Sequence, residues 1–252
     1  MLCRVCGGPT EFFDKAMVLN KYLVQYFRCT KCQFIQTEEP YWLDEAYSAA
    51  IAARDVGIMQ RNIVNRNVVA NLLRFLYSPN VNCLDFGGGH GIFVRLMRDE
   101  GYDFRWHDRY ASNDYARGFQ HASGHYDFAT AFEVIEHLPD PLHDLSELMS
   151  LADDVLVSTE LVPPHQPKVS DWWYFYPPAG QHVAFYTKRS LQVIAEKFGR
   201  HLQSRGSYHL FSKRPLNRLV FDVATSYKLS KLMNFVSRRT GLVEKDFETL
   251  TQ

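Results

Sequence analysis

Long apolar runs and an excess of charge of one sign are both missing from this sequence. No run approaches the roughly 18 apolar residues that a membrane span needs, so no transmembrane helix is expected. Lysine plus arginine and aspartate plus glutamate are equal at 28 each, whereas general nucleic-acid binders usually carry a basic excess. The first ten residues, MLCRVCGGPT, contain no apolar stretch of the kind that a secretory signal has. These absences predict a cytoplasmic protein and argue against nucleic acid as its partner.

Cysteines are few, five in 252 residues, but four of them form two Cys-x-x-Cys pairs. A disulfide framework is not expected, because the cytosol keeps thiols reduced. Four thiolates from two such pairs are the tetrahedral set that structural zinc prefers, and they leave no open position on the ion. The alternative is two redox or incidental pairs. We therefore predict a zinc ribbon over residues 1–38, with structural zinc bound by Cys3, Cys6, Cys29 and Cys32.

A glycine-rich loop follows a short apolar segment in CLDFGGGHGIF, residues 83–93. It is not a P-loop, because Gly-Lys-Ser/Thr is missing, and it is not a dinucleotide fingerprint, because Ile92 stands where that pattern needs glycine. An acidic residue followed by Gly-x-Gly-x-Gly resembles motif I of class I S-adenosylmethionine (SAM) methyltransferases. Glycines without a Cβ would let the methionine part of SAM lie on the turn. The resemblance implies SAM contacts at Asp85, Gly87, Gly88, Gly89 and Gly91.

Two further segments match the same family in the expected order. The segment YDFRWHD ends at Asp108, 17 residues beyond Gly91. A carboxylate at the tip of this strand could accept hydrogen bonds from both ribose hydroxyls. An ordinary turn or cap residue is the alternative for Asp108. The segment YDFATAFEVIEHLPDP, residues 126–141, resembles the fourth-strand motif of these enzymes. Together the three matches imply a SAM-dependent methyltransferase.

Strand-like and helix-like runs alternate from residue 80 onward. Such alternation predicts an α/β fold with a doubly wound, mostly parallel, Rossmann-like sheet. The expected strands lie in 81–86, 102–108, the first part of 125–135, and 153–162. The expected helices lie in 92–101, 141–151 and 190–199 (with Gly199 as C-cap), and an antiparallel strand pair in 201–213. We predict a helical linker over 39–79, a SAM-binding domain over 80–212 and a basic helical extension over 213–252.

The ribbon, the segment EAYSAAIAARDVGIMQRN (45–62) and the segment GQHVAFYTKRSL (180–191) together resemble bacterial methyltransferases that carry an N-terminal zinc-binding domain. Some of those proteins methylate nucleotide-linked deoxysugars or belong to polysaccharide biosynthesis. The resemblance implies a small-molecule or nucleotide-sugar acceptor, in surface-glycan biosynthesis. Two alternatives remain open: an RNA methyltransferase whose ribbon binds its substrate, and a non-catalytic scaffold that binds SAM or zinc. A homodimer also remains open.

Four polar residues are the candidates for the catalytic step. Glu133, Glu136 and His137 have the spacing i, i+3, i+4, which places them on one face of a helical turn, and His182 follows the next strand. One interpretation is that Glu133 contacts SAM and that His182 or His137 is the general base. The other is a second divalent metal held by all four side chains. The pattern resembles the metal-binding residues of small-RNA 2′-O-methyltransferases and ubiquinone-pathway O-methyltransferases.

Two further segments have an open role. The aromatic segment DWWYFYPPAG, residues 171–180, either packs in a core or dimer interface or forms a lid with Tyr174 or Tyr176 facing the acceptor. Residues 213–239 are basic and predict an amphipathic helix, which either docks on the protein body or binds an anionic acceptor or surface. Its expected apolar seam is Leu216, Leu219, Val220 and Val223.

Overall fold

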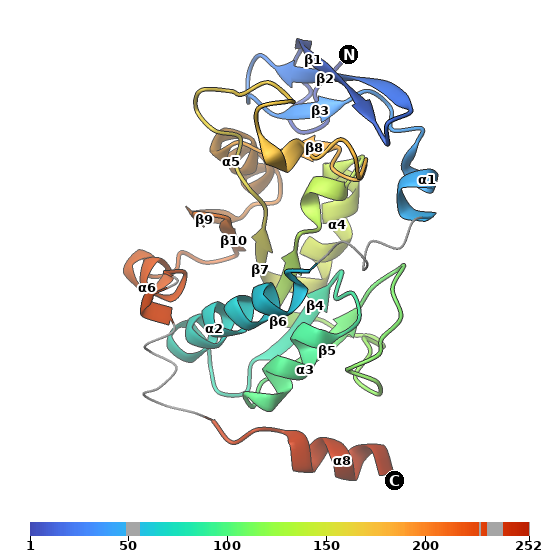
Figure 1. Ribbon diagram of the computed structural model, residues 1–252. Coiled ribbons are helices and arrows are strands. Elements are labelled where there is room, and N and C mark those ends of the chain that lie inside the picture. Colours follow the sequence, from blue (N-terminus) through green and yellow to red (C-terminus); the bar gives the residue numbers. More distant parts are fainter. Residues whose placement is uncertain (49–55, 227, 231–238, 252) are drawn as a thin grey trace. The chain divides into compact units, whose positions relative to one another are not determined.

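The computed structural model describes residues 1–48, 56–226, 228–230 and 239–251. The chain forms two compact units, each made of segments that are far apart in the sequence. The first unit comprises Met1–Arg54, Glu133–Glu147 and Val157–His209, and the second comprises Asp55–Phe132, Leu148–Leu156 and Leu210–Gln252. Figure 1 labels the helices and strands of both units.

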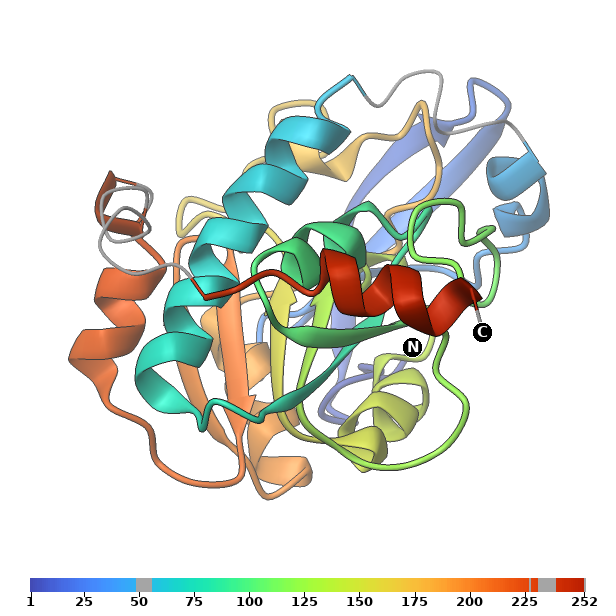
Figure 2. The same ribbon diagram turned by 90° about the horizontal axis from the view of Figure 1, so that it is seen from below.

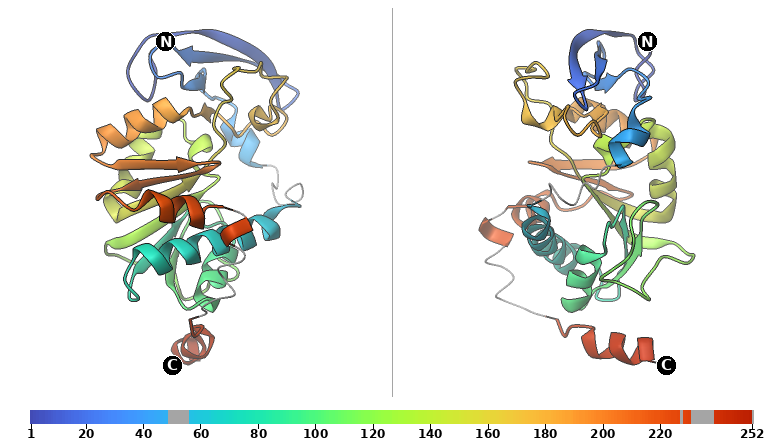
Figure 3. Two further views of the ribbon diagram at one scale, coloured as in Figure 1. Left: turned by 90° about the vertical axis from the view of Figure 1, so that its left-hand side faces the viewer. Right: turned by 45° about the vertical axis from the view of Figure 1, so that its right-hand side comes forward.

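The cysteine-containing region folds into a small antiparallel sheet in the first unit. β1 (Thr10–Val18) pairs with β2 (Tyr22–Cys29), and β2 pairs with β3 (Ile35–Thr37). Figure 3 shows the long β1–β2 hairpin from two sides. Leu19 and Asn20 at its tip have positive φ angles of 53° and 56°, which suit a type I′ turn and the twist of a two-stranded hairpin. The region predicted as a zinc ribbon therefore contains an antiparallel hairpin between its two cysteine pairs.

This sheet takes its fourth strand from a distant part of the sequence. β8 (Ala184–Phe185) pairs with β3 in an antiparallel ladder. The strand is buried in an aromatic core that also contains Trp42 and Phe175. The Trp42 indole donates a hydrogen bond to the carbonyl of Gly180 over 2.7 Å. The segment around residues 180–185 is therefore an integral part of the hydrophobic core of the first unit.

Six further strands form a larger sheet in the order β5-β4-β6-β7-β10-β9. They are β4 (Asn82–Phe86), β5 (Asp103–His107), β6 (Tyr126–Phe132), β7 (Ala152–Ser158), β9 (His201–Arg205) and β10 (Tyr208–Ser212). β4 runs parallel to both of its neighbours, β5 and β6, so the carboxyl ends of these three strands lie at one edge of the sheet. The predicted doubly wound, Rossmann-like α/β fold is confirmed.

Helices follow several strands, as the alternation in the sequence predicts. α3 (Ile92–Asp99) follows β4, α4 (Pro141–Leu151) comes between β6 and β7, and α5 (Lys188–Lys197) follows β8. In the second unit α3 lies beside α2 (Ile58–Leu76), as Figure 2 shows. Gly199 is not itself the C-cap of α5, which is the preceding residue, but it comes next with a φ of 62°, the usual conformation of a glycine that ends a helix.

Among the described residues of the C-terminal region, α6 (Arg218–Ala224) and α8 (Val243–Thr251) are separate short helices. The apolar seam predicted for this region is wrong, because Leu219 is 75% exposed whereas Phe221 is fully buried. The side chain of Asn217 accepts hydrogen bonds from the backbone amides of the first turn, so α6 begins after this cap and turns Phe221 inward.

Some predicted segments extend beyond the described residues. The helical linker predicted over residues 39–79 contains α1 (Leu43–Ser48) and α2, and residues 49–55 lie outside the described part of the chain. Residues 227 and 231–238 of the predicted basic helix also lie outside it. Among the residues that the structure describes, no helix is both long enough and apolar enough to span a bilayer.

Candidate functional site

The glycine loop connects β4 to α3 in the second unit. Three of its glycines have positive φ angles, which favour glycine: 72° at Gly87, 51° at Gly89 and 84° at Gly91. Gly88 has no room for a side chain, because a Cβ there would lie 2.8 Å from Trp106 Cδ1 and 2.9 Å from Asp85 Oδ2. A Cβ on Gly89 would meet no atom within 4 Å. The loop therefore has one closely packed side and one open side, where a ligand could lie against the backbone.

Hydrogen bonds tie this loop to β5 and to the residue that follows β5. The carbonyl of His107 accepts from the amides of the first two loop glycines over 2.8 and 3.0 Å. The Trp106 indole donates to the carbonyl of Gly89 over 2.8 Å, and the Gly89 amide donates to Asp108 Oδ2 over 3.0 Å. The loop is therefore shaped by protein contacts on its packed side.

Asp108 follows β5 directly, and most of its acceptor capacity is already used. Besides the bond from Gly89, its Oδ1 accepts from the backbone amides of Tyr110 and Ala111 over 2.7 and 2.8 Å. A carboxylate offers about four acceptor positions, so these three bonds leave about one for a ligand. Asp108 is therefore both a loop-holding residue and a candidate ligand contact, with room for one ribose hydroxyl rather than two.

Asp85 on β4 contacts the loop from the strand side. It is 3% exposed, and its Oδ1 accepts from the Thr130 hydroxyl over 2.7 Å. Burial raises the pKa of this carboxyl to about 7; the hydrogen bond from Thr130 opposes the rise, and the negative charge of Asp108 adds to it. Its Oδ2 lies where a side chain on Gly88 would be, so Asp85 helps to set the loop conformation.

The four paired cysteines come together in the first unit. The Sγ atoms of Cys3 and Cys32 are 3.6 Å apart, and those of Cys6 and Cys29 are 3.4 Å apart. All four sulfur atoms lie within 4.8 Å of one another. For Zn–S bonds of about 2.3 Å, tetrahedral geometry would separate the sulfur atoms by about 3.8 Å. The cluster therefore fits a single zinc ion.

Both cysteine pairs adopt the same backbone turn. In the first pair the amide of Gly7 donates to the carbonyl of Cys3 over 2.9 Å, and in the second the amide of Gln33 donates to the carbonyl of Cys29 over 3.1 Å. Gly7 and Gln33 have similar φ angles, 69° and 62°. Backbone amides also donate to sulfur, over 3.4 Å to Cys6 and 3.3 Å to Cys29. These amides stabilise thiolate charge, which a metal ligand requires.

A second group of potential ligands, the Glu136–His137–His182 cluster, also lies in the first unit. One ligand atom from each residue lies within 4.8 Å of the other two. The short 3₁₀ helix η2 (Ile135–His137) supplies the first two residues, and His182 precedes β8. The two imidazole rings meet edge to face, with their centroids 4.9 Å apart. The structure thus brings three of the four candidate catalytic residues together.

The two carboxyl oxygens of the fully buried Glu136 have different surroundings. Oε1 accepts from the Tyr174 hydroxyl over 2.6 Å, and that hydroxyl is 3.0 Å from the hydroxyl of Thr159. Oε2 has no hydrogen-bond partner among the described residues. Burial raises the pKa of Glu136 well above its ordinary value, and the charge of Glu133 adds to the rise. A buried carboxyl in this environment needs either a proton or a bound cation.

Burial keeps both imidazoles of the cluster neutral. It lowers the pKa of His137 to about 3; the neighbouring His182 adds to this shift and a hydrogen bond with the backbone of Gln181 opposes it. Burial also lowers the pKa of His182. The Nδ1 atom of His182 lies 2.7 Å from the carbonyl of Tyr174 and therefore carries the proton, which leaves a lone pair on Nε2. His182 can act as a base or as a metal ligand.

Glu133 does not belong to the three-residue cluster. It follows β6 directly with a φ of 53°, a conformation that is rare for residues other than glycine. Its Oε1 accepts from the Ser158 hydroxyl over 2.8 Å, and its amide donates to the same hydroxyl oxygen over 3.0 Å. The prediction that Glu133, Glu136 and His137 share one helical face is wrong, because the backbone is left-handed at Glu133 and helical only from residue 135.

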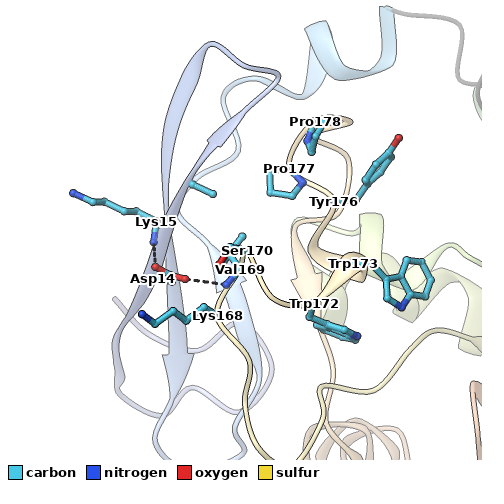
Figure 4. Close-up of a pocket in the computed structure, with 11 residues that line it drawn as sticks. Asp14, Lys15, Lys168, Val169, Ser170, Trp172, Trp173, Tyr176, Pro177 and Pro178 are labelled. Atoms are coloured by element: carbon cyan, nitrogen blue, oxygen red, sulfur yellow. Dashed lines mark hydrogen bonds between the residues drawn. The ribbon is translucent and has the colours of Figure 1, made fainter.

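The aromatic segment divides between core and surface. Tyr174 is 1% exposed, so it belongs to the core and does not face an acceptor, whereas Trp173 and Tyr176 are 72% and 44% exposed. A cavity of about 480 Å³ lies between this segment and β1 (Figure 4). In that view Lys15 and Trp173 extend in opposite directions, away from each other. No residue of the Glu136–His137–His182 cluster lines this cavity.

Residues 59–204 match the family model of a methyltransferase domain. These 146 residues are more than half of the 252-residue chain, and the chain belongs to this methyltransferase family. The predicted methyltransferase domain is thereby confirmed. No curated protein matches the chain in sequence.

Several solved methyltransferase structures are similar to this chain at low sequence identity. An O-methyltransferase family protein from Burkholderia thailandensis is 14% identical with a TM-score of 0.49, over 64% of this chain and 57% of that one. Magnesium protoporphyrin IX methyltransferase from Synechocystis PCC 6803, with bound SAH, is 14% identical with a TM-score of 0.43, over 69% and 95%. Human N-acetylserotonin methyltransferase in complex with SAM is 13% identical with a TM-score of 0.44, over 60% and 52%. The matched region spans little more than half of the Burkholderia and human proteins.

Proposed function

We propose that this protein transfers the methyl group of SAM to a hydroxyl oxygen of a small or sugar-containing acceptor. The observation that carries the choice of a hydroxyl is the neutral His182, whose Nε2 lone pair is free to take a proton. The acceptor oxygen attacks the methyl carbon, the carbon–sulfur bond breaks, and S-adenosylhomocysteine leaves. The hydroxyl proton passes to an imidazole nitrogen, and His182 is the first candidate and His137 the second.

In this proposal the glycine loop holds SAM. Gly87, Gly89 and Gly91 would approach its amino-acid part, and the open side of the loop at Gly89 supports this role. Asp108 would accept a hydrogen bond from one ribose hydroxyl with its remaining acceptor position. Asp85 and Gly88 would shape the loop from its packed side. When bound, SAM supplies a methyl group already activated on a sulfonium.

Zinc in the cysteine cluster would be structural, because four thiolates complete the coordination of the ion. The same proposal includes domain boundaries at residues 38, 79 and 212, and a nucleotide-sugar or polysaccharide-related acceptor. The resemblance of the ribbon and the segment 180–191 to sugar-associated bacterial enzymes supports that acceptor class. A second divalent metal at Glu136, His137 and His182 would change the role of the imidazoles from base to ligand.

The proposed function is tested by turnover of SAM with hydroxyl-bearing glycan precursors. We expect S-adenosylhomocysteine to form with the wild type and its rate of formation to fall about 10²- to 10⁴-fold in His182→Gln, the usual contribution of a general base. His201→Gln is the matched control, because His201 is an exposed histidine of the same unit. Calorimetry should show that His182→Gln still binds SAM. Undiminished turnover in His182→Gln, or no SAM binding by the wild type, would refute the proposal.

A further inference from the structure

Oε2 of Glu136 is a fully buried carboxylate oxygen with no hydrogen-bond partner among the described residues. Such an atom loses its hydration without compensation unless something binds to it. One carboxyl oxygen of Glu136 and one nitrogen of each of the imidazoles of His137 and His182 lie within 4.8 Å of one another. We propose that Glu136, His137 and His182 bind one divalent transition-metal ion, with coordination positions left open for an oxygen of the acceptor. The acceptor in this inference rests on the proposed function, and with the ion bound His182 and His137 act as ligands in place of general bases.

The distances in the cluster suit one shared ion. Metal–nitrogen and metal–oxygen bonds of about 2.0–2.2 Å place neighbouring ligand atoms about 3 to 4.4 Å apart, close to the 4.8 Å limit of the cluster. Two imidazoles and one carboxylate suit manganese, iron, cobalt or zinc better than magnesium, which prefers oxygen ligands. Three protein ligands leave coordination positions free, unlike the four cysteines.

Tyr174 orients two of the three ligands from opposite ends of one residue. Its hydroxyl donates to Oε1 of Glu136 over 2.6 Å, which leaves Oε2 for the ion. Its backbone carbonyl accepts from Nδ1 of His182 over 2.7 Å, which leaves Nε2 for the ion. His137 is contacted in turn by the Tyr47 hydroxyl, 3.3 Å from its Nδ1. Hydrogen bonds of this kind hold metal ligands in the correct orientation in proteins.

Glu133 lies outside the proposed ligand set. Its carboxylate accepts from the Ser158 hydroxyl, and its left-handed backbone separates it from η2. It is therefore a matched control: a second glutamate three residues from Glu136, whose side chain can be made neutral without removing a ligand. The set of four metal ligands predicted from the sequence includes Glu133, and the set of three ligands proposed here does not.

The test uses the full-length protein with zinc in the cysteine cluster and no SAM. Manganese binding is followed by electron paramagnetic resonance, since Mn²⁺ prefers oxygen and nitrogen to thiolate ligands. Metal analysis after equilibration with excess Zn²⁺ provides a second measurement, because affinity rises toward zinc along the first row. We expect one ion per chain beyond the cysteine-bound zinc. Bound Mn²⁺ should also enhance water proton relaxation, because a site with open positions keeps exchangeable water.

Four variants locate the ion. Glu136→Gln and His182→Ala should each weaken its binding at least tenfold. Tyr174→Phe keeps the ring and the carbonyl, loses only the hydroxyl, and should weaken binding about 10- to 100-fold. Glu133→Gln removes a nearby charge but no ligand and should weaken binding less than Glu136→Gln does, and the cysteine-bound zinc should stay at one per chain in all four, which reports that the unit is folded. If neither Mn²⁺ nor Zn²⁺ binds beyond the first zinc, or if Glu136→Gln and His182→Ala bind as the wild type does, the inference is wrong. Because SAM is absent throughout, failure here leaves the test of the methyl transfer intact.

Discussion

Changing Asp108 to asparagine should weaken SAM binding by damaging the loop as well as the ligand contact. The carboxylate accepts three backbone N–H groups, from Gly89 on Oδ2 and from Tyr110 and Ala111 on Oδ1. Asparagine can keep the two bonds on one side with its single carbonyl oxygen. Its NH₂ group must then face the Gly89 amide, and two donors repel each other there.

The size of the effect follows from the lost bonds. A hydrogen bond to a charged group contributes about 1.5–3 kcal/mol, and the bond from Gly89 holds the open side of the loop in place. The ribose hydroxyl also loses its hydrogen-bond acceptor, because an amide NH₂ group donates hydrogen bonds and does not accept them. We therefore expect the affinity for SAM to fall about 10- to 100-fold in Asp108→Asn.

Isothermal titration calorimetry with SAM and with S-adenosylhomocysteine measures this change directly. Asp127→Asn is the matched control in the same unit, because Asp127 is exposed and its carboxylate also accepts a backbone amide, that of Asn82 over 3.0 Å. The control should bind SAM within twofold of the wild type. If Asp108→Asn, folded to the same extent, binds SAM as tightly as the control, then Asp108 neither holds the loop nor contacts the ribose.

Two further outcomes are expected. Cys29→Ser removes one of four thiolates and should release the zinc and unfold the ribbon, and an unchanged zinc content by metal analysis would refute the site. The pKa of Asp85 is raised from 3.8 to about 7 in the folded protein, so its contribution to stability is present below pH 3.8 and is lost as the pH rises through about 7. Asp85→Asn should therefore become more stable relative to the wild type between about pH 4 and 8, by about 1.4 kcal/mol per unit of pKa shift, as measured by urea unfolding. Parallel stability curves for the two proteins would contradict this.

The sequence predicts the larger sheet well because its central strands are apolar and compact. β4, β6 and β7 are buried over most of their length, and such strands appear as short apolar runs bounded by polar or glycine residues. β8 could not be predicted in the same way. It has two residues, and it is a strand only because β3, about 150 residues earlier in the chain, offers an edge to pair with.

The candidate site also has one part that the sequence predicts and one part that it does not. The glycine loop and Asp108 lie within 25 residues of one another, and their spacing is visible in the sequence. The conformation of Glu133 is not visible, because its left-handed backbone is held by the distant Ser158. Nor does a local pattern reveal that Tyr174 contacts Glu136, 38 residues away. The aromatic segment 171–180 is visible in the sequence, but only tertiary packing decides that its Tyr174 is buried and contacts Glu136.

The aromatic segment also connects the cluster to the ribbon. Phe175 packs edge to face on Tyr26 of β2, with ring centroids 5.6 Å apart, while the adjacent Tyr174 holds Glu136 and His182. Since β2 ends at Cys29, the strand that the zinc site anchors is also the strand against which this segment packs. Zinc in the ribbon would therefore act on the chemistry without touching the substrate, by fixing the surface that positions Tyr174. The cysteine cluster and the Glu136–His137–His182 cluster are therefore linked by packing within one folded unit.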